Sequence, residues 1–304
     1  MSTQHTPSEL VLGTAQLSDP QGPDEIRDAS TLVISAALNA GVKWIETSPA
    51  YGDAEARIGR ALRTGRRAHV TTRLGSLSST DATMSVRDLI IENVSRACTR
   101  LNVGRLDVLT LDSIGELKAH GGLVWRTLKE LRDDGAIYDL GVAVTSPEEA
   151  LVAIADPAIT YLQLQFNALD WRWREAGVID ALADRPEILV HAHSALLYGM
   201  LAAAPGAKWP ASNAVDPEHL RLMLWTLAKD MGRDCPADLC IAYVRAQPWI
   251  HGVIAGARSA SQMALNISRF RRPALTRDEI ERVNSVMPHV PVSMLGVQRM
   301  IRAA

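Results

Sequence analysis

The feature that most constrains the fold of this chain is an alternation of short apolar runs with longer amphipathic segments. Such alternation is typical of βα units around a parallel sheet. The runs predicted to be strands are Leu10–Gly13, Val42–Glu46, His69–Arg73, Asp107–Leu111, Tyr138–Ala143, Tyr161–Gln165, Ile188–Ala192 and His251–Ala255. The segments predicted to be helices are Ala29–Ala40, Ala54–Leu62, Val86–Asn102, Leu123–Asp133, Pro147–Ala155, Glu175–Ala183, Pro217–Met231 and Ser261–Phe270. Strict alternation of this kind predicts an α/β fold, a (β/α)8 TIM barrel.

The rival to a barrel is a doubly wound sheet, but the first predicted strand is not followed by the glycine pattern GxGxxG. Thr276-Arg-Asp-Glu279 has the form of a capping box and predicts an extra helix over Arg277–Val286, before a tail from Val292 to Ala304. The helix starts at Ser146, Asp216 and Ser259 carry similar capping residues. No low-complexity linker divides the chain, so we expect one domain over residues 1–304.

The composition excludes some classes of binding partner. The chain has 304 residues, 47% of them hydrophobic, and a formal net charge of −2. It therefore lacks the basic field that nucleic acid or an anionic membrane would require. Three cysteines without a CxxC pair favour a reducing compartment, and the N-terminus lacks the pattern of a signal peptide. We expect a cytoplasmic protein that acts on a small molecule, with no nucleic-acid or membrane partner; the sequence leaves the oligomeric state open.

Charged and polar side chains gather at the predicted carboxyl ends of strands, where barrels place their active sites. Glu46 and Arg73 end the second and third strands, Asp112 follows the fourth, and Tyr51 lies in the loop after Glu46. An arginine beside a tyrosine favours the phenolate and would lower the phenol pKa, while a carboxylate would hold the arginine in place. This cluster is either catalytic or a structural ion-pair network that closes the top of the barrel.

The loop after the eighth strand contains Gly256 and Arg258, and Ser259 caps the helix that follows. Backbone N–H groups at a helix start bind phosphate, and an arginine adds a fixed positive charge. A phosphate site is predicted here; an ordinary turn with a surface arginine is the alternative. His191 and His193 have no partner ligand at metal spacing, so we predict no metal site and place His191 in the core.

Several motifs in the same order resemble the aldo-keto reductase family. They are Leu12-Gly-Thr-Ala15, Ile45-Glu-Thr-Ser-Pro-Ala-Tyr-Gly-Asp-Ala-Glu55 with Ile58-Gly59, Ser194-Ala-Leu-Leu-Tyr-Gly-Met-Leu201 and Ile254-Ala-Gly-Ala-Arg-Ser-Ala-Ser-Gln-Met-Ala-Leu-Asn266. The segment Gln163…Asn167-Ala-Leu-Asp-Trp-Arg172 is similar to a bacterial subgroup linked to polysaccharide or sugar biosynthesis. The resemblance covers most of the chain.

The resemblance implies a nicotinamide cofactor, NADP(H), lying across the top of the barrel. It places Gln163 against the carboxamide and His193 where an aromatic residue stacks on the nicotinamide ring. The residues that it implies for the phosphates and adenosine are Ser194, Gly199, Gly256, Arg258, Gln262 and Asn266. Leu265 replaces a glutamate of the family pattern, and Ala143-Val144 replace a serine–asparagine pair.

The family's catalytic tetrad is aspartate, tyrosine, lysine and histidine, and only Tyr51 matches it. Glu46 stands for the aspartate, Arg73 for the lysine and Asp112 for the histidine. Arg73 does not deprotonate and so cannot carry a proton. An ionised Asp112 would repel the oxyanion that hydride transfer to a carbonyl creates.

Three readings follow from this altered tetrad. In the first, a desolvated and protonated Asp112 donates to a carbonyl, or to a conjugated enone, while Tyr51 supplies a proton. In the second, Asp112 is a base opposite the acid Tyr51 in a lyase or epimerase that acts on a sugar-like substrate. In the third, the barrel is a catalytically inactive binding protein. We expect the first, an NADP(H)-dependent oxidoreductase acting on a small, sugar-like metabolite.

Overall fold

The structure is a computed structural model that describes residues 7–17, 24–77, 84–203 and 216–295. Eight parallel strands close into a barrel in sequence order, from β1 to β8 and back to β1. The strands are β1 Glu9–Gly13, β2 Trp44–Glu46, β3 His69–Arg73, β4 Leu106–Leu111, β5 Ile137–Val144, β6 Tyr161–Gln165, β7 Leu189–His193 and β8 Gly252–Gly256. Each overlaps a predicted strand, so the predicted (β/α)8 barrel is confirmed.

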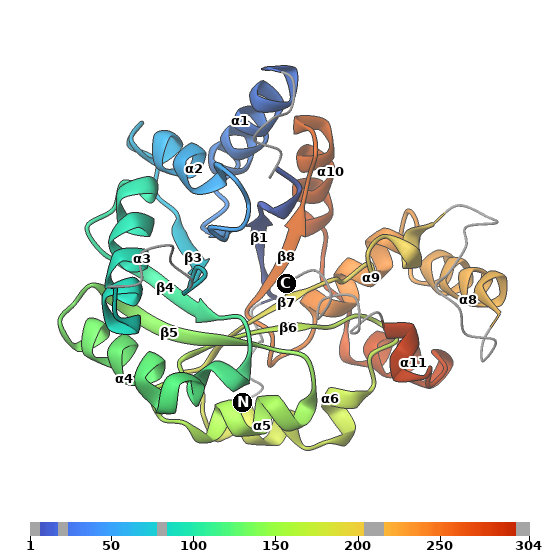
Figure 1. The fold of residues 1–304 in the computed structure, drawn as a ribbon. Coiled ribbons are helices and arrows are strands. Elements are labelled where there is room, and N and C mark those ends of the chain that lie inside the picture. The colour runs from blue at the N-terminus through green and yellow to red at the C-terminus, as the bar shows by residue number, and fades with distance from the viewer. Residues whose placement is uncertain (1–6, 18–23, 78–83, 204–215, 296–304) are drawn as a thin grey trace, which may run out of the picture.

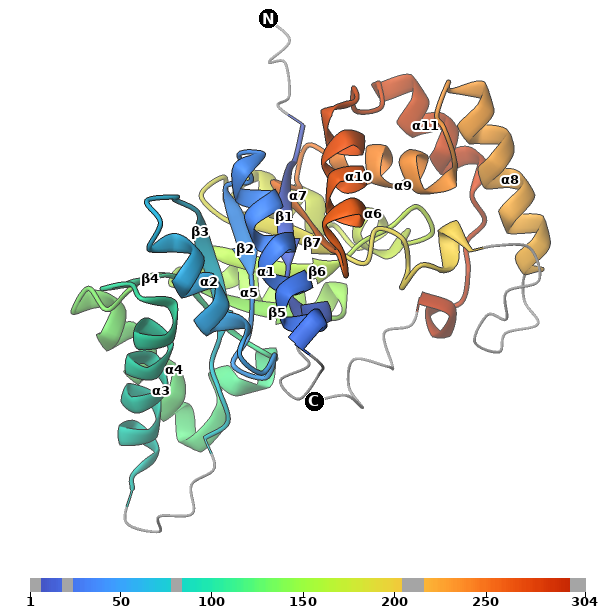
Figure 2. The same cartoon turned by 90° about the horizontal axis from the view of Figure 1, so that it is seen from above.

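The helices form a ring outside the sheet (Figure 1). They are α1 Asp24–Asn39, α2 Ala54–Leu62, α3 Val86–Leu101, α4 Ala119–Asp133, α5 Pro147–Ala155, α6 Arg172–Glu175, α7 Val178–Ala183, α8 Pro217–Asp230, α9 Pro236–Arg245, α10 Ala260–Arg271 and α11 Arg277–Val286. Short 3-10 turns are η1 Ala15–Leu17, η2 Ile114–Leu117, η3 Met200–Ala202 and η4 Val292–Leu295. In both views α8 lies at the periphery, and the predicted extra helix is α11 (Figure 2). Within the described ranges no helix is both long and apolar enough to cross a membrane.

One helix was missed by the sequence prediction. All ten residues of α9, between α8 and β8, are buried, so its sequence has no polar face that would mark a helical period. A second difference lies in the predicted helix Glu175–Ala183, which is divided into α6 and α7 at Gly177, where φ is 75°. His120, Gly121 and Gly122 have left-handed φ values at the start of α4, so its regular part begins at Leu123 as predicted.

The predicted helix caps are present. Ser146, Ser259 and Thr276 each accept a hydrogen bond from the backbone N–H three residues later, and Asp216 accepts one from the backbone of Glu218. The full reciprocal capping box forms at Thr276. Such caps satisfy N–H groups that would otherwise lack a partner at the first turn. Each helix therefore begins at a fixed place relative to the strand before it.

The interior of the barrel is filled in layers because alternate residues of a strand point to the same side. Trp44, Tyr161 and His191 meet in one layer, with ring centroids 5.0 Å apart in both the Trp44–His191 and the Tyr161–His191 pair. His191 is 1% exposed, which confirms the predicted core position. Burial, with a smaller effect from His251, lowers the pKa of His191 to about 3. Two residues further along these strands come Glu46, Gln163 and His193, so the next layer toward the active face is polar.

Candidate active site

The four residues predicted from the altered tetrad lie together at the carboxyl ends of β2, β3 and β4. Arg73 joins them: its Nη2 lies 3.3 Å from Glu46 Oε1, and its Nη1 lies 2.9 Å from Asp112 Oδ1. The hydroxyl of Tyr51 donates to the same Glu46 oxygen at 3.4 Å. The guanidinium carbon of Arg73 lies 5.9 Å from the centre of the Tyr51 ring. One planar guanidinium therefore links both carboxylates and faces the phenol.

The electrostatics of Tyr51 differ from the sequence expectation. Burial and the negative charge of Glu46 raise the pKa of Tyr51, and the opposing effect of Arg73 is smaller. Arg73 does act to lower this pKa, as expected, but the expected net lowering is wrong, because the pocket desolvates the phenolate and places a carboxylate beside it. Burial likewise raises the pKa of Glu46, which is 4% exposed, although the charge of Arg73 acts in the opposite direction. Tyr51 is therefore a neutral phenol at neutral pH, with a hydroxyl hydrogen available to donate.

Asp112 is more exposed to solvent than the mechanism with a protonated Asp112 requires. Its side chain is 43% exposed, and one of its oxygens accepts the Arg73 hydrogen bond. The desolvated pocket expected around Asp112 is therefore a wrong prediction, since the residue lies beyond the end of β4 at the open rim. Glu116 in η2 turns back and accepts hydrogen bonds from the backbone of Asp112 and Ser113. Burial, together with the negative charge of Asp112, raises the pKa of Glu116.

A cavity of about 640 Å³ gathers the cofactor residues predicted from the family resemblance. It is lined by all eight of them: Gln163, His193, Ser194, Gly199, Gly256, Arg258, Gln262 and Asn266. Glu46, Tyr51 and Arg73 line the same cavity. Residues from β2, β6, β7, β8 and α10, far apart in the sequence, thus face one continuous space.

The groups around this cavity suit a nicotinamide dinucleotide. The end near α10 presents the guanidinium of Arg258 and the amide of Asn266, which donates to the Gly256 carbonyl at 3.2 Å. A Cβ at Gly256 would lie 3.0 Å from the Gln16 side chain, so a glycine keeps the space beside the strand end open. Cations and backbone near a helix start suit phosphates, and amides suit a base.

The Gln262 side chain has a contact that the family pattern did not suggest. Its Oε1 accepts from the backbone N–H of Arg258 at 2.9 Å, which closes the turn that leads into α10. Arg269, Tyr198 and Gln16 also line the cavity and were not predicted. Arg269 follows Leu265 by four residues, so helical spacing from that cavity-lining position could have found it.

At the other end of the cavity, Gln163 and His193 are held by neighbours. Gln163 is 3% exposed, and its side chain hydrogen-bonds Glu46. Because an ionised carboxylate only accepts, the Gln163 amide N–H is the donor, and its oxygen stays available as an acceptor. Desolvation and the charge of Arg73 lower the pKa of His193 to about 3, so its imidazole is neutral. His193 Nδ1 lies 2.9 Å from the hydroxyl of Ser194.

The loop after β7 carries backbone strain where it borders the cavity. Ser194, Leu197 and Tyr198 have φ values of 59°, 46° and 56°, a region that side chains other than glycine rarely occupy. Gly199 follows with φ 88°. Left-handed residues of this kind cost free energy and gather at functional sites. The strain is therefore consistent with a loop shaped for a ligand.

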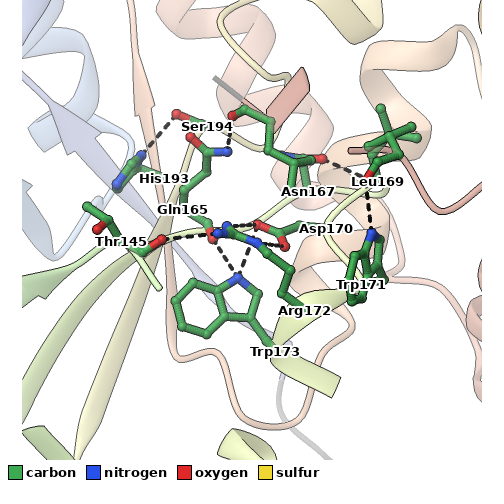
Figure 3. Close-up of polar contacts among 12 residues, drawn as sticks. Thr145, Gln165, Asn167, Leu169, Asp170, Trp171, Arg172, Trp173, His193 and Ser194 are labelled. Atoms are coloured by element: carbon green, nitrogen blue, oxygen red, sulfur yellow. Dashed lines mark hydrogen bonds and ion pairs between the residues drawn. The ribbon is translucent and has the colours of Figure 1, made fainter. Parts of the chain in front are cut away.

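Behind this loop, a polar network joins the β6 end to the C-terminal segment (Figure 3). Arg172 pairs with Asp170 through two hydrogen bonds of 2.8 and 2.7 Å, both side chains being almost fully buried. The Trp171 indole donates to the Val290 carbonyl at 3.1 Å, and the Gln165 amide donates to the Leu295 carbonyl. These bonds fix the chain up to η4 against the rim of the barrel.

Asp112 lines a second cavity, of about 980 Å³, that sequence reasoning did not predict. Its walls come from the loops after β2, β3 and β4, from one side of α3 and from the start of α4. Tyr51 and Arg73 line both this second cavity and the first cavity of about 640 Å³, so they stand at the boundary between the two.

Comparisons with known proteins agree with this geometry. The chain is 23% identical over 294 residues to an uncharacterised oxidoreductase of Bacillus subtilis, a match that covers 91% of this chain and 92% of that protein. It is 28% identical to D-arabinose 1-dehydrogenase of Saccharomyces cerevisiae over 183 residues, which is 53% of this chain and about half (54%) of the relative.

Solved structures show the same fold. A glycerol dehydrogenase from Gluconobacter oxydans superposes with a TM-score of 0.74 at 25% identity, covering 94% of each chain. An aldo-keto reductase from Bacillus halodurans has a TM-score of 0.76 at 21% identity, covering 93% of each chain. The sequence profile described as Aldo/keto reductase family matches residues 9–288. Because this match spans most of the chain, the chain belongs to the aldo/keto reductase family.

Proposed function

We propose that this protein is an NADP(H)-dependent oxidoreductase that reduces a carbonyl group of a small, sugar-like metabolite. The observation that carries the proposal is Tyr51: a neutral phenol, held by Glu46, at the boundary of two cavities. Membership of the aldo/keto reductase family supports a nicotinamide cofactor in the first of these cavities. A relative and a structural neighbour are named for D-arabinose and glycerol, which supports a polyhydroxylated substrate.

The nicotinamide, when bound, supplies the hydride. Tyr51 would donate its proton to the carbonyl oxygen, and Arg73 would stabilise the phenolate that remains. Glu46 orients both groups through one oxygen. Arg73 acts here as a fixed charge, since a guanidinium does not give up its proton. The altered tetrad thus keeps a proton donor in Tyr51 and a cation in Arg73. It differs from the family tetrad in the group that would face the substrate, Asp112.

The preference for NADP(H) over NAD(H) rests on charge at the α10 end of the cavity. Arg258 and Arg269 both line it, within a chain of overall charge −2. A 2′-phosphate carries negative charge that arginine binds with a planar fork of donors. Gly256 and Ser194 line the same cavity and would hold the pyrophosphate.

Titration of NADPH, followed through the change in cofactor fluorescence, tests the first part of the proposal. We expect binding in the micromolar range, at least tenfold tighter than for NADH, and a loss of that preference in Arg269→Ala. Absence of binding at tens of micromolar would overturn the redox proposal and favour a catalytically inactive barrel.

Turnover of a Tyr51→Phe variant tests the second part. We expect loss of carbonyl reduction with cofactor affinity retained, because only the hydroxyl is removed. Tyr138→Phe is the matched control, since Tyr138 is 60% exposed at the opposite end of the barrel. Full activity of the Tyr51 variant would remove Tyr51 from the mechanism. Turnover of a sugar without net oxidation of NADPH would instead identify a lyase or epimerase that uses Tyr51 and Asp112.

A further inference from the structure

We propose that the second cavity is the substrate site, and that Asp112 selects α-hydroxy carbonyl compounds and the matching vicinal diols. In this arrangement the reacting carbonyl accepts from Tyr51, while a hydroxyl on the neighbouring carbon donates to Asp112. The proposal rests on the proposed function and names its substrate class. It makes Asp112 a residue that determines specificity, in place of a donor to the carbonyl.

The first argument is the division of space. The eight predicted cofactor residues line one cavity, whereas Asp112 lines the other. Tyr51 and Arg73 are common to both. A cofactor in the first cavity would leave the second open to a further molecule, and the proton donor would face both. The second cavity is therefore the space from which a substrate reaches Tyr51.

The second argument is the way in which Asp112 is held. Its backbone is fixed by Glu116, and its Oδ1 accepts from Arg73 at 2.9 Å. Its other carboxylate oxygen has no hydrogen-bond partner among the described residues, and the side chain is 43% exposed toward the cavity. A carboxylate paired with an arginine accepts hydrogen bonds and cannot donate them. The substrate group that suits this oxygen is a hydroxyl donor.

The third argument is charge balance. Three arginines line the second cavity, and each has a carboxylate partner: Arg73 with Asp112, Arg96 with Glu92 at 3.6 Å, and Arg100 with Glu55 at 3.5 Å. Their charges are therefore already compensated within the protein. This wall favours a neutral, hydroxylated substrate over a phosphate or carboxylate.

The fourth argument is the chain of contacts that joins the donor to the acceptor. The fork of Arg73 holds Asp112 with one nitrogen and Glu46 with the other, and Glu46 in turn holds the Tyr51 hydroxyl. Donor and acceptor are thus linked through a single guanidinium group. An α-hydroxy carbonyl presents an acceptor and a donor on adjacent carbons, one group for each member of that pair. Its hydroxyl also separates the developing oxyanion from the Asp112 charge, which would otherwise oppose the reaction.

The reaction balances without any further reagent. The carbonyl carbon receives from NADPH a hydride, which consists of one proton and two electrons. The carbonyl oxygen receives the Tyr51 proton. The products are a vicinal diol and NADP⁺, and Tyr51 regains a proton from solvent. In the reverse direction the diol loses a hydride to NADP⁺ and a proton to the phenolate.

The test compares matched substrates in matched variants. The ratio of kcat/KM for 2-hydroxypropanal to that for propanal should be at least about tenfold in the wild-type protein, since a hydrogen bond to a charged group has that magnitude. Asp112→Leu should bring the ratio close to one, and Asp112→Asn, which keeps one oxygen acceptor, should give an intermediate ratio. Asp184→Leu, at an exposed position after α7, is the control. An unchanged ratio in Asp112→Leu would overturn the proposal.

Binding without turnover separates this proposal from the proposed function. In a ligand-observed NMR titration, propane-1,2-diol should bind the wild-type protein at least about fivefold tighter than Asp112→Leu, while propan-1-ol should bind both equally. If neither aldehyde is reduced, the proposed function fails, yet the diol titration still decides the role of Asp112. Equal affinity of the diol for the wild type, Asp112→Asn and Asp112→Leu would overturn it. Circular dichroism of each variant shows whether the fold is retained.

Discussion

At the scale of single residues, Arg73 carries the arrangement of the candidate site. Its two terminal nitrogens reach two different carboxylates, Glu46 and Asp112, while its plane lies near Tyr51. A lysine has one charged nitrogen on a flexible stem and cannot reproduce a planar fork. Arg73 stands where the family tetrad has a lysine, and we expect this difference to affect catalysis through geometry as well as through charge.

We predict that Arg73→Lys lowers kcat by about tenfold or more, because the ammonium holds only one carboxylate at a time. NADPH affinity should change little, since Arg73 lines the cavity beside Tyr51 and Glu46, away from the arginines proposed to bind the cofactor phosphates. Arg277→Lys is the control, because the Arg277 side chain is 91% exposed on α11 and lines neither cavity. Steady-state kinetics with cofactor titration measure both effects. Retained kcat would show that a point charge is sufficient.

The raised pKa of Tyr51 gives a prediction on pH. A phenol with a pKa above its ordinary value of about 10 stays protonated through the neutral and mildly basic range. The kcat for carbonyl reduction should therefore not decline between about pH 7 and pH 9 from loss of the Tyr51 proton. A pH profile measured with saturating NADPH checks this. A decline of kcat with a midpoint between pH 7 and pH 9 would contradict the prediction, if no such decline appears in the pH profile of a slower step that does not involve Tyr51.

At the scale of elements, the C-terminal segment packs Val290, Met294 and Leu295 into the core and receives hydrogen bonds from a few side chains of the barrel. The Gln165 amide donates to Leu295, the Trp171 indole donates to Val290, and the His289 ring stacks on Trp171 with centroids 5.0 Å apart. These contacts come from β6 and its following loop (Figure 3). The position of η4 at the rim thus depends on polar contacts from one strand end, 130 residues earlier in the chain, as well as on its own buried side chains.

We predict that Gln165→Met releases this segment while the barrel stays folded. The change removes the donor to the Leu295 carbonyl and leaves a buried acceptor unpaired, at a cost of about 1–3 kcal/mol. Hydrogen exchange should become faster at residues 290–295 and stay unchanged in α5, which serves as an internal control. Equal protection of the C-terminal segment in both proteins would show that the other contacts are sufficient.

At the scale of the whole molecule, the sequence predicted the barrel because its strands alternate with amphipathic helices. The family resemblance also named eight residues as cofactor-binding; the structure brings all eight to one cavity, and their role in binding a cofactor stays a prediction. The sequence prediction missed α9, because a helix buried on every side has no polar face. It could not give the environment of Tyr51 or Asp112, because burial and distance to a charge depend on loops that no local pattern specifies. The second cavity is a product of three such loops.

The polar interior gives the molecule a predictable response to acid. His191 has a folded-state pKa of about 3, below the ordinary value near 6.5. The unfolded chain therefore binds a proton that the folded chain does not, and stability is complete above about pH 6.5 and falls as the pH falls toward 3. We predict a loss of about 2 kcal/mol of unfolding free energy from this residue between pH 6.5 and pH 5.

Urea unfolding at several pH values measures this slope. His191→Gln should be less stable at pH 7, since it loses the contact with the Tyr161 hydroxyl at 3.1 Å, but its stability should depend less on pH. His69→Gln is the control, because His69 is exposed at the start of β3. The same slope in the wild type and in His191→Gln would mean that other groups set the acid response.

The left-handed backbone of the loop after β7 has a consequence for engineering. Ser194, Leu197 and Tyr198 each hold a conformation that glycine or asparagine would adopt at lower cost. A selection for heat resistance alone would therefore enrich such replacements here, and a selection for turnover would discard them. Deep mutational scanning under the two regimes should diverge most sharply at these positions. In a map of tolerated substitutions, this loop would then be the place where thermal stability and catalytic activity favour different residues.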